Sequence, residues 1–377
     1  MSLERLKPTW EKPPQLISLF SGCGGMDLPF KMAGFEVVWA IDSNKYACET
    51  FKRNISPVIT HNSIEKINIK QEVPDADLII GGFPCQDFSL IWKRYGLDVE
   101  RGNLYTYFRE FVKQKKPKAF VAENVKGLLS ANNHQAIKQI IQDFENIEPR
   151  YLVKPKLYNF ADYGVPQFRQ RVLLVGIQMD TGFNFVHPQP EYGPNRNNPY
   201  RTAGEALKNV EAVLDNNTHH KIQTRTVEIL NRIQPGGNFA DIPKDSPYYV
   251  KGMISHVYRR IHPDKPSSTI IAGGGGGTWG YHYLEPRSLT NRERARLQTF
   301  PDDFVFEGST TEVRRQIGNA VPPQGIAAVV ESLIPLFKED YPKVDLYQMS
   351  QKLQGMSIQQ RLKWAESEGF EQSLQLI

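Results

Sequence analysis

The sequence predicts an α/β fold, in which a mostly parallel, doubly wound sheet accompanies a smaller, loop-rich domain. Short apolar runs alternate with segments of helical composition, which is typical of a parallel sheet. A glycine turn, 21–25, follows the first apolar run. From about residue 181 to 283 the chain is instead rich in Pro, Asn, Gly and Tyr, with little helical periodicity. The 377 residues suffice for one major and one minor domain.

The expected elements follow from this alternation. Residues 16–20 are a short apolar run and predict a buried strand, and the helix expected over 27–33 is stopped by Gly34. A second strand, 35–41, has Asp42 at its end. Further strands are expected at 78–80, 119–122 and 172–177, and helices at 46–53, 104–113, 135–144, 290–299 and 325–337. The tail after Asp345 is helical in composition, and its Leu362, Trp364 and Phe370 are expected to dock on the body.

Composition narrows the class of protein. The net charge of +5 permits binding to a polyanion without requiring it. Three well-separated cysteines do not form a disulfide framework, and no Cys/His cluster suggests a metal site. Residues 1–5 lack the apolar run of a signal peptide, and no apolar stretch is long enough to span a bilayer. We therefore expect a cytoplasmic protein with no membrane partner and no metal.

The segment Phe83-Pro84-Cys85-Gln86 is the most informative motif. It follows the apolar run 76–80, and Gly81-Gly82 break that strand. A cysteine is thereby expected on a turn at a strand end, where reacting groups of open α/β sheets lie. Taken alone, Cys85 is better interpreted as a small buried core residue, and it is the other motifs of the chain that favour a reacting group.

The turn containing Gly22, Gly24 and Gly25 lets backbone N–H groups approach a ligand, and Asp42 suits a grip on ribose hydroxyls. Together they indicate a site for an adenosine-containing cofactor. The dinucleotide fingerprint is not met, because Asp27 stands where its third glycine belongs. A purely structural turn therefore remains an alternative.

Two further segments carry polar chemistry. Glu123 ends the strand 119–122, and burial beside a ligand would raise the pKa of its carboxyl and make it a proton donor. The two-residue spacing of Arg169 and Arg171 places both on one face of an extended segment, where they could hold an oxygen acceptor. An exposed acid and a surface arginine pair are the alternatives.

These motifs, in their order, resemble those of the DNA (cytosine-5)-methyltransferases, particularly the bacterial restriction–modification type. The resemblance rests on Phe20-x-Gly22-x-Gly24-Gly25, Pro84-Cys85-Gln86, Glu123-Asn124-Val125, Gln167-x-Arg169-x-Arg171, Arg287-x-Leu289-Thr290-x-Arg292-Glu293 with Gln298-x-Phe300-Pro301, and Gly318-Asn319-Ala320-Val321-Pro322-Pro323. It implies a sheet of the S-adenosylmethionine-dependent methyltransferase type. It also implies four parts: a catalytic and cofactor-binding part, 13–180; a target-recognition domain, 181–286; a return segment completing the catalytic domain, 287–338; and a helical tail, 339–377.

The resemblance implies covalent catalysis on a cytosine flipped out of double-stranded DNA. Cys85 would add to C6, while Glu123 contacts N3 and the exocyclic amine and protonates N3. Arg171 would hold O2 and orient Glu123, and Arg169 would stabilise the adduct and its surroundings. The methyl group would come from S-adenosyl-L-methionine, leaving S-adenosyl-L-homocysteine.

The same resemblance implies a cofactor site with some departures from the family. Its expected residues are Phe20, Gly22, Gly24, Gly25, Asp42, Ser43, Asn62, Ser63, Ile64, Pro84, Leu104, Asn319 and Ala320. Asp42 stands where glutamate is usual, and Ser43 where a bulky residue often packs on adenine. The usual aspartate for the adenine amine is absent, so Asn62 or Ser63 must serve.

DNA contacts are expected in two regions. A mobile loop after the nucleophile, 86–102, would close on the flipped base, with Gln86, Ser89, Lys93, Arg94 and Arg101 as DNA ligands. The recognition region offers Arg225, His256, Tyr258, Arg259, Arg260, Thr278, Trp279, Tyr281 and His282, and its glycine run 273–277 would permit close approach to a groove. A cognate restriction endonuclease acting without a stable complex, and a monomeric state, are also implied.

Other classes fit less well. The main RNA cytosine methyltransferases carry their cysteine on the strand where this chain has Glu123-Asn124-Val125. The transfer-RNA branch that shares the DNA-type motifs is expected to lack a sizeable recognition module. A non-catalytic homologue should have lost Cys85, Glu123 or Arg171, and all are present. A nicotinamide oxidoreductase would leave Cys85 and Glu123 without roles.

Overall fold

The structure, a computed structural model, describes residues 3, 6–7, 10–84, 104–219, 221–249, 251–252, 257–273 and 279–375, without the side chains of 279 and 369–375. The chain divides into two compact units. The first, the sheet unit, comprises Met1–Asn159, Gln170–Gln189 and Ile326–Ile377. The second, the loop-rich unit, comprises Phe160–Arg169 and Pro190–Gly325.

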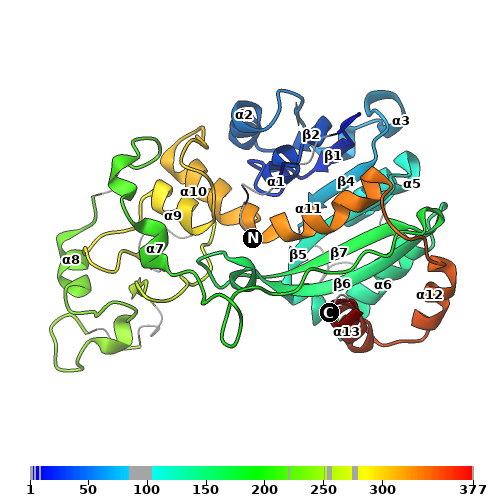
Figure 1. The fold of residues 1–377 in the computed structure, drawn as a ribbon. Coiled ribbons are helices and arrows are strands. Elements are labelled where there is room, and N and C mark those ends of the chain that lie inside the picture. Colours follow the sequence, from blue (N-terminus) through cyan, green and yellow to red (C-terminus); the bar gives the residue numbers. More distant parts are fainter. Residues whose placement is uncertain are drawn as a thin grey trace. The chain divides into compact units, whose positions relative to one another are not determined.

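Seven strands of the described chain form one sheet in the sheet unit, in the order β3-β2-β1-β4-β5-β7-β6 (Figure 1). They are β1 (Gln15–Leu19), β2 (Glu36–Asp42), β3 (Thr60–His61), β4 (Leu78–Gly82), β5 (Ala119–Val125), β6 (Tyr151–Asn159) and β7 (Gln170–Gln178). Neighbours from β3 to β5 are parallel, whereas β7 is antiparallel to β5 and β6 antiparallel to β7. The prediction of a mostly parallel α/β sheet is confirmed.

Helices cover both faces of this sheet. They are α1 (Asp27–Met32), α2 (Lys45–Asn54), α3 (Ile69–Glu72), α5 (Leu104–Lys115), α6 (Gln135–Glu145), α11 (Pro323–Lys338, in this unit from Ile326), α12 (Leu346–Leu353) and α13 (Ile358–Gln375). On one face Phe120 of β5 packs against Phe108 of α5 and Phe144 of α6. Elsewhere Phe35 packs edge-on against Phe30 of α1 and Phe337 of α11.

The edge strand β6 was not predicted, because Lys154, Pro155 and Lys156 interrupt its apolar pattern. Proline is tolerated on an edge strand, where its missing N–H breaks no ladder. Lys154 is buried, and its ammonium group contacts Asn184, Glu368 of α13 and the ring of Trp364. The helical tail therefore packs on the sheet partly through the ion pair between Lys154 and Glu368. Leu362 packs against the main core as expected, and the side chain of Phe370 lies outside the described residues.

The loop-rich unit contains short elements: α7 (Ala203–Leu207), α8 (Thr224–Leu230), β8 (Arg259–Arg260), β9 (Trp279–Tyr281), α9 (Asn291–Leu297) and α10 (Thr310–Asn319). The sequence predicted that 287–338 return to the catalytic part, but residues up to Gly325 cluster with this unit. The reason is that α9 packs against α7 and α10, and that Arg292 donates to the carbonyl of Asp215.

No single helix among the described residues is long and apolar enough to cross a membrane, although α10 and α11 pass that test when taken together as a bent pair.

Gly176 in β7 makes the pairing of β5 with β7 possible. It lies opposite Phe120, and a Cβ there would be 2.1 Å from the Phe120 ring. We expect Gly176→Ala to lower the free energy of unfolding by about 1–3 kcal/mol, as overpacked cores do. Urea unfolding of the wild type and the variant measures this difference in the free energy of unfolding. Gly127→Ala is the matched control, because its Cβ would meet nothing closer than 3.9 Å. Equal midpoints for the two variants would contradict this account of the β5–β7 contact.

Candidate active site

The predicted site residues of the sheet unit lie at one edge of the sheet. The strands β1, β2, β4 and β5 are parallel, so their carboxyl ends share that edge. The glycine turn follows β1, Asp42 ends β2, Pro84 follows β4 and Glu123 lies near the end of β5. Leu104 is the first residue of α5 and packs on the core.

The turn after β1 requires unusual backbone angles. Phe20, Gly22 and Gly24 have φ values of 53°, 55° and 91°, in the left-handed region that favours glycine. A Cβ on Gly24 would lie 2.4 Å from Ile55, whereas no atom of the described residues lies within 4 Å of the position of a Cβ on Gly22. The turn is therefore packed behind Gly24 and open at Gly22, as a backbone cradle for a ligand requires.

Asp42 connects this turn to the end of β2. One carboxylate oxygen accepts the Gly22 N–H and the other accepts the Asn44 N–H, both at 2.8 Å. Burial raises the pKa of the Asp42 carboxyl, and these N–H groups partly offset the rise. Asp42 is thus held in place by the turn.

The neighbouring candidates lie beside Asp42. The Asn62 N–H donates to the main-chain carbonyl of Asp42, at 3.2 Å, and the Asn62 side-chain oxygen accepts the Ser63 N–H. Ser43 is exposed, and its carbonyl lies 3.2 Å from His61 Nε2. Ile64 is buried in the main core. The structure therefore places Ser43, Asn62 and Ser63 near Asp42, at the end of β2.

Glu123 and Arg171 form an ion pair between β5 and β7, with 2.8 Å between Arg171 Nε and Glu123 Oε1. Both side chains are largely buried, at 15% and 12% exposure for Arg171 and Glu123. In the ladder Arg171 lies opposite Val125, so it reaches Glu123 diagonally on the same face. A Cβ on Gly82 would lie 2.7 Å from Glu123 Oε2. Glycine in β4 thus leaves room for the carboxylate.

Asn124 connects this pair to the cysteine motif. It is buried, its side-chain N–H donates to the carbonyl of Phe83 at 2.8 Å, and its side-chain oxygen accepts the Val125 N–H. Sequence analysis gave Asn124 no role, although an amide directly after an acid at a strand end was a usable signal. The amide anchors the chain two residues before Cys85. Cys85, Gln86, Ser89, Lys93, Arg94 and Arg101 lie outside the described residues.

Arg169 belongs to the loop-rich unit, whereas Arg171 belongs to the sheet unit. The Arg169 guanidinium is buried and donates at 2.9 Å to the carbonyls of Ile270, Gly318 and Ala320. It therefore positions the predicted cofactor residues Asn319 and Ala320, which lie in its own unit. The contacts of Arg169 are thus with the backbone of its own unit, and its role in stabilising the adduct stays a prediction.

Arg260 was expected to contact DNA, but it is buried and supports the backbone. Its guanidinium donates to four carbonyls, those of Leu230, Ile233, His282 and Tyr283. Extended segments alternate their side chains, so the neighbouring Arg259 is half-buried instead. The structural role of Arg260 replaces the base-reading role predicted for it.

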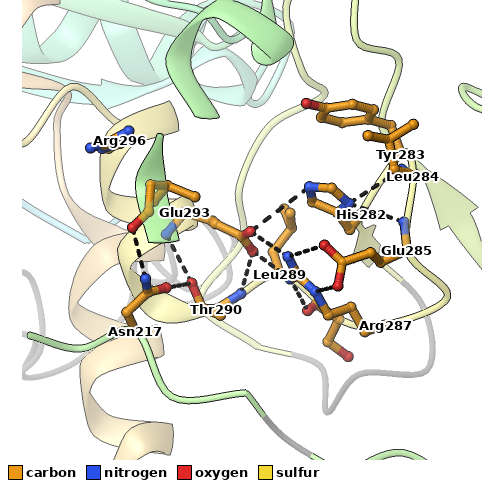
Figure 2. A network of polar contacts seen from close by, with 12 residues as sticks. Asn217, His282, Tyr283, Leu284, Glu285, Arg287, Leu289, Thr290, Glu293 and Arg296 are labelled. Carbon is orange, nitrogen blue, oxygen red and sulfur yellow. Dashed lines mark hydrogen bonds and ion pairs between the residues drawn. The ribbon is translucent and has the colours of Figure 1, made fainter. Parts of the chain in front are cut away.

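His282 is likewise buried, in the polar network of Figure 2. Its Nδ1 accepts the N–H groups of Leu284 and Glu285, and Glu293 Oε1 lies 3.9 Å from its Nε2. Burial lowers the pKa of His282, which favours the neutral ring that can accept these bonds. Arg287 donates two hydrogen bonds of 2.8 Å to the Glu293 carboxylate. We assign His282 a structural role and correct its prediction as a DNA ligand.

The other predicted readers differ in exposure. Arg225 is exposed, Tyr258 is half-buried, and Tyr281 is buried and stacked on Tyr258. His256, Thr278, the side chain of Trp279 and most of the glycine run lie outside the described residues. Among the described residues, no group of three or more His, Cys, Asp or Glu side chains is arranged to hold a metal ion.

Asp27, at the start of α1, is a buried carboxyl that sequence analysis noted only as a missing glycine. Neither of its oxygens nor the buried Ser18 hydroxyl makes a well-aligned hydrogen bond within the described part of the chain. Burial raises the pKa of Asp27 to about 7, and the nearby Ser18 hydroxyl offsets the rise only in part. The turn is therefore followed by a buried carboxyl whose pKa lies well above its ordinary range.

Residues 15–335 match the family described as C-5 cytosine-specific DNA methylase. The chain is 61% identical to the type II methyltransferase M.NgoFVII of Neisseria gonorrhoeae, covering 89% of this chain and 90% of that protein. It is 40% identical to M.BbvI of Brevibacillus brevis, covering 87% and 92%. A crystal structure of a putative prophage-encoded DNA modification methyltransferase of E. coli has a TM-score of 0.65 at 23% identity, covering 86% and 99%.

The corrected role of Arg260 predicts a large loss of stability on its removal. Arg260→Met would leave several buried carbonyls without a partner, at a cost of about 3 kcal/mol in the free energy of unfolding. Arg259→Met is the matched control and should cost less than about 1 kcal/mol. Urea midpoints of both variants test this. A loss for the Arg260 variant no larger than that for the Arg259 variant would contradict the structural role assigned to Arg260.

Asp27 predicts a pH-dependent stability. Its folded pKa of about 7 exceeds the ordinary 3.8, so the folded protein binds this proton more tightly than the unfolded chain. Its stabilising contribution is complete below the ordinary value and is lost as pH rises through about 7. We expect Asp27→Asn, which stays neutral, to exceed the wild type in stability by at least about 1 kcal/mol at alkaline pH. Free energies of unfolding measured across the pH range should show this difference in stability disappearing in acid. A difference that stays constant with pH would contradict the prediction.

Proposed function

The chain belongs to the C-5 cytosine-specific DNA methylase family, and we propose that it transfers a methyl group from S-adenosyl-L-methionine to C5 of a cytosine flipped out of a specific double-stranded DNA sequence. The observation that carries the proposal is the arrangement at the ends of β4 and β5. The Glu123 carboxylate, paired with Arg171, lies over Gly82, and Asn124 anchors the segment that leads into Cys85.

The residues at the β1 and β2 ends fit the proposed cofactor. Within the described part of the chain the backbone is open at Gly22, and Asp42 is oriented there by two N–H groups. Gly22, Gly24 and Gly25 would approach the methionine portion, and Asp42 the ribose hydroxyls. Asn62 and Ser63 would face the adenine. S-adenosylmethionine, when bound, supplies the methyl group and leaves as S-adenosylhomocysteine.

The chain's own residues would make C5 nucleophilic. The Cys85 thiolate forms a bond to C6, and the ring electrons move through C5 and C4 to N3, which takes a proton from Glu123. Arg171 orients Glu123 and holds O2 of the base. C5 then accepts the methyl group. N3 returns its proton to Glu123, and loss of the C5 proton to a base restores the C5–C6 double bond and expels the Cys85 thiolate.

The target atom is buried in a duplex, so the reaction requires base flipping, and the segment 86–102 would close on the flipped nucleotide. The relatives M.NgoFVII and M.BbvI are described as type II methyltransferases, which supports a place in a restriction–modification system. We therefore propose a cognate endonuclease that acts without a stable complex, and a monomeric cytoplasmic methyltransferase.

Bisulfite sequencing of DNA from cells that express the chain tests the function directly. Cytosines protected at one recurring sequence, compared with cells carrying the empty vector, are expected. This result would reveal the target sequence together with the activity. Absence of protection in cells that contain folded, expressed protein would refute the proposed function.

The covalent step predicts a trapped complex. Duplex DNA with 5-fluorocytosine at the target should become covalently bound in the presence of S-adenosylmethionine, because fluorine cannot leave as a cation and elimination stalls. Cys85→Ala should abolish the trap and methyl transfer while leaving cofactor binding nearly unchanged. Denaturing electrophoresis detects the complex, and Cys48→Ala is the matched control, since Cys48 is buried beside Asp42. Trapping by the Cys85 variant would refute the assigned nucleophile.

A further inference from the structure

An open cleft of about 530 Å³ lies within the loop-rich unit. One side follows the chain from Arg259 to His262, and the other follows 265–271. The lining residues are Phe168, Gly236, Asn238, Arg259, Arg260, Ile261, His262, Lys265, Pro266, Ser267, Ser268, Thr269 and Ile271. None of these described lining residues is acidic, so the cleft is positively charged.

The cationic groups of the cleft differ in their availability. The guanidinium of Arg260 donates to four carbonyls, so it contributes charge rather than ligand contacts. Lys265 is exposed, and its flexible ammonium group can reach a bound anion. Its main chain is fixed, because its carbonyl accepts the Ala203 N–H at 2.9 Å.

His262 adds a second donor. Its Nδ1 accepts the Asp264 N–H at 3.1 Å, so the ring proton of the neutral form is on Nε2, where it can be donated to a ligand. The ring lies against the backbone of Gly236, where a Cβ would be 2.7 Å from His262 Cδ2. Glycine at 236, with a φ of 82°, thus admits the ring to the cleft wall.

Hydroxyl groups complete the lining. Ser267 is 1% exposed, and its hydroxyl has no hydrogen-bond partner in the described part of the chain. Ser268 is half-buried, and the Thr269 hydroxyl donates to the Phe168 carbonyl at 2.7 Å. A lysine, a histidine ring N–H and serine hydroxyls form the donor set that commonly binds phosphate oxygens.

We infer that this cleft is a DNA backbone site, in which Lys265 and His262 bind a phosphodiester group. The inference rests on the proposed function, because it assigns part of the DNA to this unit. Shape favours the backbone over a base edge: bases are read by side chains that protrude into a groove, whereas the ridge of phosphates fits a concave surface. Neither residue was predicted from sequence as a DNA ligand.

Salt dependence of binding tests the inference. A labelled duplex containing the site identified by bisulfite sequencing, and a second duplex of unrelated sequence, are titrated with the wild-type chain between about 50 and 200 mM salt. Lys265→Gln should reduce the slope of log affinity against log salt by about one and weaken binding to both duplexes by a similar factor, roughly five- to tenfold. Lys244→Gln, an exposed lysine outside the cleft lining, is the matched control and should leave the slope unchanged.

His262→Gln should weaken binding to both duplexes equally, because its Nε2–H donates a hydrogen bond to a phosphate whatever the sequence. A Lys265 variant with the wild-type slope would overturn the inference, as would one that loses affinity for the target duplex alone. Either result would leave the proposed function intact if the variant still methylates the site. A folded wild-type chain that binds neither duplex would instead refute the proposed function.

Discussion

The antiparallel pairing of β7 with β5 is the constraint on which the candidate active site depends. It places Arg171 opposite Val125, so that the guanidinium reaches diagonally to Glu123 on the same face. The pairing is possible because Gly176 leaves room for the ring of Phe120. Parallel pairing of β4 with β5 then sets Gly82 beside Glu123. Two glycines and two strand directions thus position one carboxylate at the sheet edge.

In addition to Glu123, other polar side chains at the same edge of the sheet hold the loops in place. Asn124 links the end of β5 to the chain before Cys85, and Asp42 links the glycine turn to β2. Each bond satisfies a main-chain group that a tight turn leaves without a partner. The same bonds restrict the motion of the site, which favours preorganised catalysis. The candidate site is therefore supported from the sheet rather than by the loops themselves.

The loop-rich unit is stabilised in a different way from the sheet unit. It has little regular structure, and one of its apolar clusters consists of only four buried residues, Ile229, Ile233, Phe239 and Ile242, with partly buried neighbours. Its main-chain carbonyls are instead bound by buried guanidinium groups. Arg169, Arg260 and Arg292 each donate to three or four of them. Arginine suits this task because its planar group offers five donors in a fixed geometry.

Local sequence was sufficient to predict β1, β2, β4, β5 and β7, whereas the two-residue strand β3 was not predicted. Apolar runs such as 16–20 and 78–80 predicted β1 and β4 because buried parallel strands are nearly uniformly apolar. The glycine turn and the ends of β2 and β5 were also placed correctly, because strand ends and glycines act within a few residues. β6 was missed, since its Lys154 is neutralised by Glu368, which is distant in sequence.

Which arginine supports the backbone was decided by tertiary structure. Arg259 and Arg260 are chemically identical neighbours, yet Arg259 is half-buried, whereas Arg260 is buried and donates to carbonyls of the segment 230–233 and of the chain after β9. Arg169 and Arg171 likewise share a motif but belong to different units. Local sequence specifies residue type and strand alternation, whereas the partner of a side chain depends on segments that only the folded chain brings together.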